Sequence, residues 1–206
     1  MKIKICGLMN LADAQYCCQL NTWALGFNFY PKSPRYISST VAKEIINALL
    51  PCAILKVGIY IGASYDMLLQ QMDDIGLDLV QVYAPLSDAP SSFKDRVILS
   101  LQAATKHDLP PASVLSSYRY ILLDAPKMHN DLPGGTGRSA NWVLAETMAR
   151  DYPLILAGGL NADNIRHAIQ TVHPYAIDLA SGVEKAPGVK DQLEINRLFE
   201  ECQYDN

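Results

Sequence analysis

The chain has 206 residues, half of them hydrophobic and 18% charged, and its 17 basic and 21 acidic residues give a formal net charge of −4. This composition excludes an intrinsically disordered chain, and the acidic balance argues against a protein that coats nucleic acid, which needs a basic face. The longest apolar stretches, such as Tyr120–Leu123, are far shorter than the ~20 residues of a membrane span, and the N-terminus lacks a secretory signal, so we expect a cytoplasmic protein without membrane partners.

Short β-rich runs alternate with longer segments of helical spacing along the chain. The predicted strands are Lys2–Cys6, Ala24–Phe29, Ala53–Ile59, Leu77–Tyr83, Arg96–Leu101, Arg119–Asp124, Pro153–Gly158 and Tyr175–Ala180. The predicted helices run from Asn10 or Asp13 to about Leu20, and over Ser38–Leu50, Ser64–Ile75, Ser139–Ala149, Asn161–Thr171 and Asp191–Cys202. Prolines interrupt the two remaining linking segments, 87–95 and 102–117, and leave their helical state open.

Eight βα units without a Gly/Ser-rich linker predict an α/β fold, a single (β/α)8 TIM barrel, as one domain over residues 1–206. The competing architecture is an open doubly wound sheet, which normally carries a glycine-rich turn after its first strand. Here the first strand ends in Cys6-Gly7-Leu8, and the glycine-rich turns follow strands six, seven and eight. Late glycine turns favour the barrel, which often holds a phosphate group after its seventh and eighth strands.

The five cysteines form no CxxC pair and have no histidine at metal-ligand spacing, so neither a disulfide framework nor a structural zinc site is expected. Cys17, Cys18, Cys52 and Cys202 are interpreted as small core residues in a reducing compartment.

Cys6 and Asp124 differ from the other cysteines and acids because each closes a predicted strand. The active site of a barrel lies at the carboxyl ends of its strands. A thiolate is a competent base and a partly buried carboxyl a competent acid, so the pair could divide these roles. The alternative is that Cys6 only packs and Asp124 only caps a loop.

Glycine turns follow the last three strands. They contain Gly135, Thr136, Gly137 and Arg138 after strand six, Gly158 and Gly159 after strand seven, and Ser181 and Gly182 after strand eight. Glycine lets backbone N–H groups approach an anion, and Arg138 adds positive charge. Each could be an ordinary turn, but together they predict a phosphate site.

The loop after strand two, Tyr30–Tyr36, holds Arg35 between prolines and aromatic rings. A guanidinium can bind a carboxylate through two hydrogen bonds, so Arg35 is a candidate carboxylate ligand. The alternative is a solvated charge on a surface loop.

Together these residues resemble the phosphoribosylanthranilate isomerase family of tryptophan biosynthesis. The matching blocks are Lys4–Leu8, Gly26–Ser38, Leu77–Gln81, Leu122–Asp124, Gly134–Trp142, Leu156–Asn164 and Ile177–Asp191. Several ordered blocks at matching strand ends are more specific than any single motif, whereas the segment from about residue 83 to 118 is not diagnostic.

The resemblance implies an Amadori rearrangement of N-(5-phosphoribosyl)anthranilate to 1-(2-carboxyphenylamino)-1-deoxyribulose 5-phosphate. In that reaction Asp124 would protonate the furanose ring oxygen, and Cys6 as thiolate would remove the proton from the sugar C2. Arg35 would bind the anthranilate carboxylate, Asp178 a sugar hydroxyl or the amine, and the glycine turns the 5-phosphate. The resemblance implies a small phosphorylated substrate and no metal or redox cofactor, and leaves a monomer or a homodimer open.

The chain also departs from the family pattern. Tyr83 replaces a histidine after strand four, where it can still donate a hydrogen bond, and Arg138 replaces a lysine. Ala140 and Ala180 replace an aromatic residue and a serine. Two alternatives therefore stay open: another phosphosugar isomerase or epimerase on the same barrel, or a non-catalytic relative that binds phosphorylated metabolites.

Overall fold

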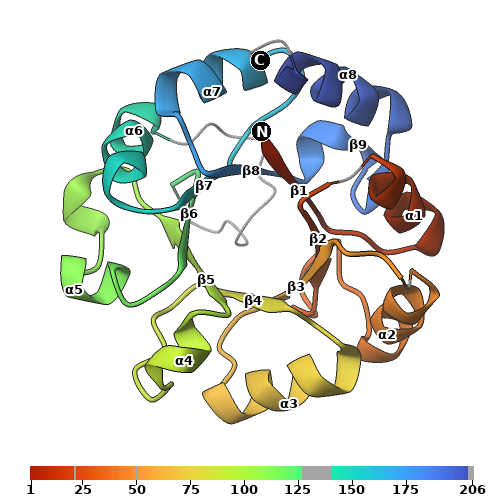
Figure 1. The fold of residues 1–206 in the computed structure, drawn as a ribbon, viewed down its shortest axis with the longest axis horizontal. Helices are drawn as coiled ribbons and strands as arrows, with labels where there is room; N and C mark the ends of the chain where they lie inside the picture. Colours follow the sequence, from red (N-terminus) through yellow and green to blue (C-terminus); the bar gives the residue numbers. More distant parts are fainter. Residues whose placement is uncertain (21, 50, 127–140, 204–206) are drawn as a thin grey trace.

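A closed barrel of parallel strands forms the centre of the protein, seen in a computed structural model that describes residues 1–20, 22–49, 51–126 and 141–203 (Figure 1). Each strand pairs with its neighbours in chain order, and β8 returns to β1. The barrel strands are β1 Lys2–Cys6, β2 Ala24–Asn28, β3 Leu55–Tyr60, β4 Leu79–Val82, β5 Val97–Gln102, β6 Tyr120–Asp124, β7 Leu154–Leu156 and β8 Ala176–Leu179. The predicted TIM barrel is confirmed.

Helices surround the barrel, as Figure 1 shows. The longer ones are α1 Leu11–Gln19, α2 Ser39–Ala48, α3 Tyr65–Ile75, α6 Trp142–Asp151, α7 Ile165–Val172 and α8 Gln192–Gln203. Side-chain oxygens of Asn10, Ser38 and Ser64 accept a backbone hydrogen bond at the starts of α1, α2 and α3, which explains why those helices begin there. Asn141 caps α6 in the same way.

Two hydrophobic clusters hold the layers together. Val57, Ile98 and Leu122 belong to the cluster inside the barrel, which consists almost entirely of strand residues. The larger cluster packs the outer strand faces against the helices and includes Ile5, Leu25 and Leu68, all fully buried. Strands buried on both faces explain the nearly continuous apolar runs of the sequence.

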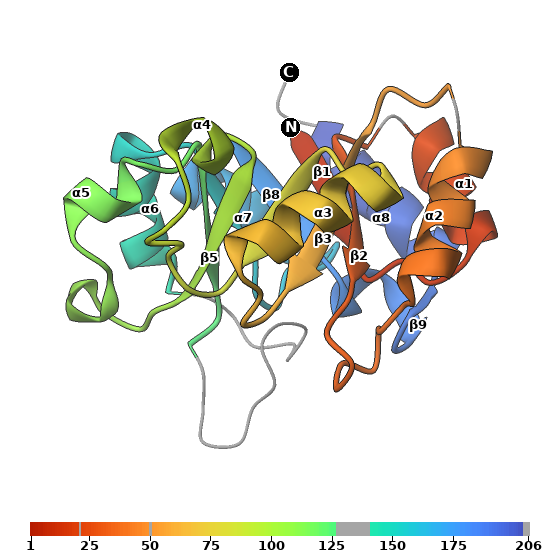
Figure 2. The same cartoon turned by 90° about the horizontal axis from the view of Figure 1, so that it is seen from below.

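The structure contains elements that the sequence did not predict. The strands β9 Glu184–Ala186 and β10 Val189–Lys190 form an antiparallel hairpin after β8, next to the one-turn 3-10 helix η2 Ser181–Val183. The two proline-interrupted segments hold only the short helices α4 Ser91–Lys94 and α5 Ala112–Leu115 and the 3-10 turn η1 Lys106–Asp108. In Figure 2, β9 and the N-terminus lie at opposite ends of the barrel.

The four cysteines that were interpreted as core residues differ in burial. Cys17 is fully buried, as predicted for a core residue. Cys18, Cys52 and Cys202 pack against the edge of the core and are half-buried, so the prediction that they are core residues is wrong in part.

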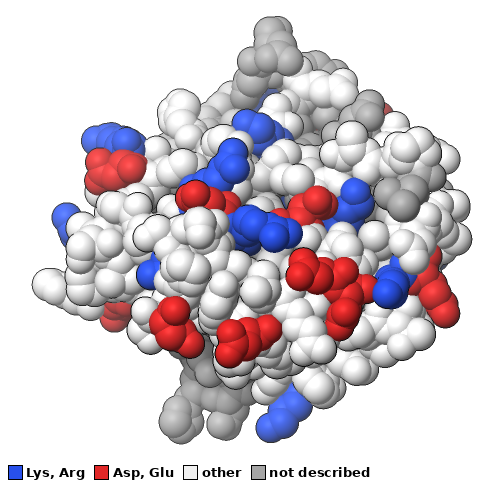
Figure 3. All heavy atoms as spheres, turned by 60° about the horizontal axis from the view of Figure 1, so that its bottom comes forward, with Lys and Arg blue, Asp and Glu red and all other residues white. Residues whose placement is uncertain are grey.

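On the face shown in Figure 3, basic and acidic side chains lie interspersed. Among the helices of the described ranges, none combines the length and the apolar character needed to cross a bilayer.

Candidate active site

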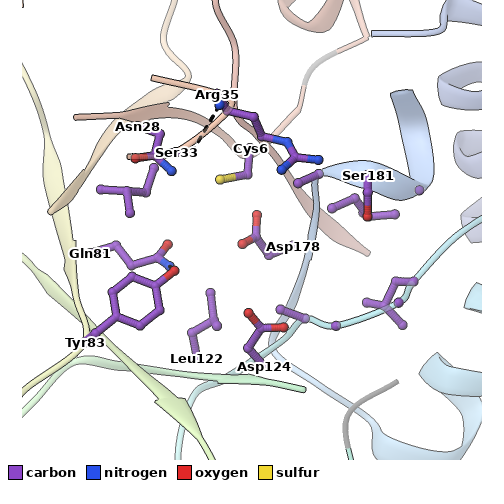
Figure 4. A pocket seen from close by; sticks show the side chains of 18 residues that line it. Cys6, Asn28, Ser33, Arg35, Gln81, Tyr83, Leu122, Asp124, Asp178 and Ser181 are labelled. Carbon is purple, nitrogen blue, oxygen red and sulfur yellow. Dashed lines mark hydrogen bonds between the residues drawn. The ribbon is translucent and has the colours of Figure 1, made fainter. Parts of the chain in front are cut away.

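A cavity opens at the carboxyl ends of the barrel strands (Figure 4). The predicted site residues that line it are Cys6, Arg35, Tyr83, Asp124, Gly158, Gly159, Asp178, Ser181 and Gly182. Residues from β1, β4, β6 and β8 and from the loops after β2, β7 and β8 therefore meet in one place, although they are far apart in the sequence.

Cys6 and Asp124 close β1 and β6 and enter this cavity from different walls. Figure 4 shows the Cys6 thiol above and the Asp124 carboxyl below, with the Asp178 carboxyl between them. Strands of a barrel splay their ends around a common mouth, so two terminal side chains on non-adjacent strands can face one bound molecule from two directions.

A buried lysine forms the floor beneath these groups. Lys4 is fully buried, and its ammonium donates to Asp178 Oδ1 at 2.8 Å and to Gln81 Oε1 at 3.1 Å. Lys4 and Asp178 occupy paired positions on β1 and β8, which places their side chains side by side. Burial would lower the pKa of Lys4, but the charges of Asp178 and Cys6 outweigh burial and raise it, so the ammonium stays charged.

Opposing influences act on the thiol of Cys6. Burial raises its pKa above the ordinary value, and the Asp178 carboxylate adds to the rise. The ammonium groups of Lys4 and Lys190 act in the opposite direction. Because a carboxylate repels a thiolate and two cations attract it, any change that neutralises Asp178 favours the ionised form of Cys6.

The Asp124 carboxyl is poised to hold a proton near neutral pH. Burial raises its pKa to about 6, and Asp178 contributes to the rise. The Ala125 N–H, which donates to Oδ1 at 2.8 Å, and Lys4 oppose it. A carboxyl with a pKa close to the working pH suits a general acid.

Tyr83 lies on the wall formed by β4, where its hydroxyl accepts a 3.4 Å hydrogen bond from Gln81 Nε2. Burial raises the pKa of this phenol, and the charges of Asp124, Cys6 and Asp178 add to the rise. Tyr83 therefore stays protonated and presents a hydrogen-bond donor to the cavity.

Two of the three predicted glycine turns lie on the opposite wall. Gly158 and Gly159 follow β7 with φ of 85° and 64°, a conformation that favours glycine. Gly182 follows β8, and a Cβ there would lie 1.9 Å from the Leu160 carbonyl oxygen, so only glycine fits. The third turn, with Gly135, Thr136, Gly137 and Arg138, lies outside the described residues.

Arg35 is buried rather than solvated, and one edge of its guanidinium is already paired. Its Nε and Nη2 donate to the Glu184 carboxylate at distances between 2.6 and 3.1 Å. Burial opposes the ionisation of Glu184, but Arg35 and Lys190 outweigh it and hold the pKa of Glu184 below its ordinary value. Arg35 is thus held by a charged partner while still lining the cavity.

Lys190 connects the Arg35–Glu184 pair to the backbone of Cys6 and Ala180. Its fully buried ammonium donates to Glu184 Oε1 at 2.7 Å, to the Cys6 carbonyl at 2.6 Å and to the Ala180 carbonyl at 3.3 Å. The β9–β10 hairpin therefore ties the end of β1 to the turn after β8 and to Arg35.

Sequence reasoning missed Gln81, Glu184 and Lys190 as site residues. Gln81 stands two residues before Tyr83. Because side chains two positions apart in a strand point to the same face, the position of Tyr83 could have indicated Gln81 as a site residue. Glu184 and Lys190 lie in a matching block of the resemblance, but nothing local in the sequence pairs Glu184 with Arg35, 149 positions away.

Comparison with known proteins gives a family match. The family model described as "N-(5'phosphoribosyl)anthranilate (PRA) isomerase" matches residues 3–201. An N-(5'-phosphoribosyl)anthranilate isomerase of Pelobacter propionicus is 42% identical, over 97% of this chain and 94% of its own length. The protein of that name from Syntrophus aciditrophicus is 38% identical, over 96% of this chain and 85% of its own.

Solved structures give the same result. The phosphoribosyl anthranilate isomerase of Thermotoga maritima superposes with a TM-score of 0.82 at 32% identity, covering 98% of both chains. A phosphoribosyl anthranilate isomerase in complex with reduced 1-(o-carboxyphenylamino)-1-deoxyribulose 5-phosphate superposes with a TM-score of 0.80 at 32% identity, also over 98% of both chains.

Proposed function

The chain belongs to the N-(5'-phosphoribosyl)anthranilate isomerase family, and from that premise we propose that Cys6 and Asp124 are the base and the acid of its reaction. The reaction is the Amadori rearrangement of N-(5-phosphoribosyl)anthranilate in tryptophan biosynthesis. The observation that carries the proposal is that the thiol and the carboxyl enter one cavity from different walls, at the ends of β1 and β6.

Asp124 acts first. Its carboxyl, with a pKa of about 6, retains a proton in part of the molecules at neutral pH and gives it to the furanose ring oxygen. The C1–O bond then breaks, and the anthranilate nitrogen supplies the electron pair that forms a protonated imine. The positive charge on this nitrogen acidifies the hydrogen on C2.

Cys6 acts second. Its thiolate removes the proton from C2, and the electron pair moves through C1 to the nitrogen, which gives an enolamine that tautomerises to the ketone. Lys4 and Lys190 support the thiolate electrostatically. Asp178, held by Lys4, lies where its carboxylate can accept a hydrogen bond from the substrate amine or a sugar hydroxyl.

The pH profile of kcat is expected to fall below about pH 6. The reactive form carries a protonated Asp124 and an ionised Cys6, whose pKa is raised. Below pH 6 Asp124 is already protonated, so further acid only removes thiolate. Between the two pKa values the loss of acid offsets the gain of base, and the profile is flat; above the pKa of the thiol it falls.

The Asp124→Asn variant provides the control for this profile. Its residual rate should lose the acidic limb, because unassisted ring opening, in which the thiol takes no part, then limits the rate. The substrate phosphate also ionises near pH 6, but it does so equally with both enzymes. If the variant keeps the same acidic limb and the same plateau, Asp124 is not the acid.

The substrate phosphate would bind at the glycine turns. Backbone N–H groups around Gly158–Gly159 and Ser181–Gly182 line the cavity and can donate to phosphate oxygens. We assign Gly135, Thr136, Gly137 and Arg138 to the same phosphate site from the sequence. The ligand in this proposal is a small phosphorylated molecule. We expect the enzyme to be a monomer or a homodimer and to act in the cytoplasm.

Arg35 would bind the anthranilate carboxylate with the edge that Glu184 leaves free. Glu184 occupies Nε and Nη2, so the guanidinium is fixed in its plane before the substrate arrives. A pre-oriented fork loses less conformational entropy when it binds a carboxylate than a free side chain does. Lys190 balances the negative charge of Glu184, so the network does not cancel the attraction of Arg35 for the substrate.

Arg35→Ala is expected to raise KM by about 10-fold or more, the effect of one lost charged hydrogen bond, with a smaller change in kcat. Glu184→Gln should raise KM less, because it loosens Arg35 without removing it. The double variant should be no worse than Arg35→Ala alone. Steady-state kinetics of the three variants test this, with Glu146→Gln, which breaks the exposed pair with Arg150, as the matched control. Fully additive effects would mean that Glu184 does not act through Arg35.

Turnover of the anthranilate substrate, followed by its fluorescence, tests the function directly. The wild type should convert it, and the Cys6→Ala/Asp124→Asn double variant should leave only the uncatalysed rate. Conversion of non-aromatic phosphosugars instead would indicate a different phosphosugar isomerase. Binding of the reduced product analogue without turnover would indicate a non-catalytic relative.

A further inference from the structure

Two cysteines outside the active site lie in contact. The Sγ atoms of Cys18 and Cys52 are 2.6 Å apart, although 34 positions separate them in the chain. Cys18 is the penultimate residue of α1, and Cys52 precedes β3. Both segments lead into strands, so the pair lies at the amino end of the barrel, opposite the cavity that holds Cys6.

The separation is only ~0.5 Å longer than an S–S bond of about 2.05 Å. Cys18 is fixed by its helix, and Lys56 Nζ donates to the Cys52 carbonyl at 2.8 Å, which holds that backbone in place. The two thiols are therefore already positioned for bond formation, and little movement of the backbone is required.

Small molecules in solvent can reach this pair. Both residues are half-buried and line an open depression of about 680 Å³, whose wall also includes Trp23 and Ile54. The neighbouring Cys17 is fully buried in the core and does not line the depression, so access distinguishes Cys18 from the residue beside it.

We propose that Cys18 and Cys52 are a covalent modification site, which forms a reversible disulfide by exchange with a low-molecular-weight disulfide such as oxidised glutathione. One protein thiolate attacks the S–S bond of the reagent, forms a mixed disulfide and releases one reduced thiol. The second protein thiol loses its proton, attacks the mixed disulfide and releases the second reduced thiol. The protein loses two electrons and two protons in total, and the reagent gains them.

The bond would tie the end of α1 to the segment before β3. A crosslink across 34 positions restricts the unfolded chain and stabilises the fold. Residues at the amino end of a barrel serve stability rather than catalysis, so the bond would change the melting temperature and leave the cavity in place.

The test is to incubate the reduced enzyme with oxidised glutathione and then to measure intact mass, peptide map and melting temperature. The expected product is lighter by two hydrogen atoms, contains a Cys18–Cys52 peptide, melts about 5 °C or more higher, and reverts with a reducing agent. Cys18→Ser and Cys52→Ser should lose the crosslink and the shift, whereas the matched control Cys17→Ser should keep both. Peptide mapping separates this bond from any reaction at Cys6, so the result does not depend on the proposed catalytic roles.

Cys18 and Cys52 recovered as free thiols under conditions that modify Cys202 would overturn the proposal. A bond from either residue to a different cysteine would do the same.

Discussion

Replacing Cys6 with alanine is expected to lower kcat by about 10² or more, because the variant has no group to take the proton from C2. Neither Asp178 nor Tyr83 can replace it: Asp178 is engaged by Lys4, and the raised pKa of Tyr83 keeps that phenol protonated. The loss should appear in kcat rather than in KM, since the carboxylate and phosphate sites are untouched. Stopped-flow fluorescence at saturating substrate measures it.

Cys17→Ala is the matched control for this experiment. It removes a buried thiol that faces the core and does not line the cavity, so kcat should stay at the wild-type value. Affinity for the reduced product analogue should be unchanged in both variants. Normal turnover by Cys6→Ala would show that Cys6 is not the base that removes the C2 proton.

Asp124→Asn is expected to combine a loss of activity with a gain in stability. The amide cannot protonate the ring oxygen, so kcat should again fall by about 10² or more. The stability of the protein should rise at neutral pH, because the substitution removes a carboxylate whose ionised form is disfavoured by burial.

The pH window of this gain follows from the two pKa values of Asp124. Its pKa is about 6 in the folded protein against 3.8 for an ordinary aspartate, so the folded state binds the proton more tightly. Wild-type stability therefore declines as pH rises from about 4 to 6, and above 6 the full penalty, about 3 kcal/mol, is present. Urea unfolding of the wild type and of Asp124→Asn tests this. The two proteins should have nearly equal free energies of unfolding at pH 4, and the variant should be the more stable one at pH 8.

Asp78→Asn serves as the control, since Asp78 is half exposed and lies at the other end of β3 and β4. It should leave kcat unchanged and give no stability gain above pH 6. An Asp124→Asn enzyme that turns over normally, or one that is equally destabilised at both pH values, would contradict the assignment.

The barrel itself was predictable because its strands are short apolar runs with βα spacing, and all eight predicted strands overlap an observed one. The hairpin β9–β10 was not predictable by pattern, because strands of three and two residues, with the sequences EKA and VK, carry no alternation to detect. The prolines near α4 and α5 correctly signalled irregular structure but gave no way to place four-residue helices.

The site was predictable wherever the fold rule alone places a residue at a strand end, as for Cys6, Asp124 and Gly158. The ion pairs of Arg35 with Glu184 and of Lys4 with Asp178 were not predictable from the sequence. Arg35 was expected to be free for a ligand or solvated, whereas Glu184 pairs with it across 149 positions. Lys4 has the same strand parity as Cys6, but its full burial and its bond to Asp178 depend on the closure of β1 against β8, which no local pattern shows.

The division of roles between Cys6 and Asp124 is tested most directly by a deuterium atom at C2 of the substrate ribose. In single-turnover reactions Cys6→Ser should show a full primary isotope effect, because removal of the C2 proton limits its rate. Asp124→Asn should show almost none, because ring opening, which breaks no bond to hydrogen at C2, limits it instead. Equal isotope effects in the two variants would contradict the assignment of acid and base.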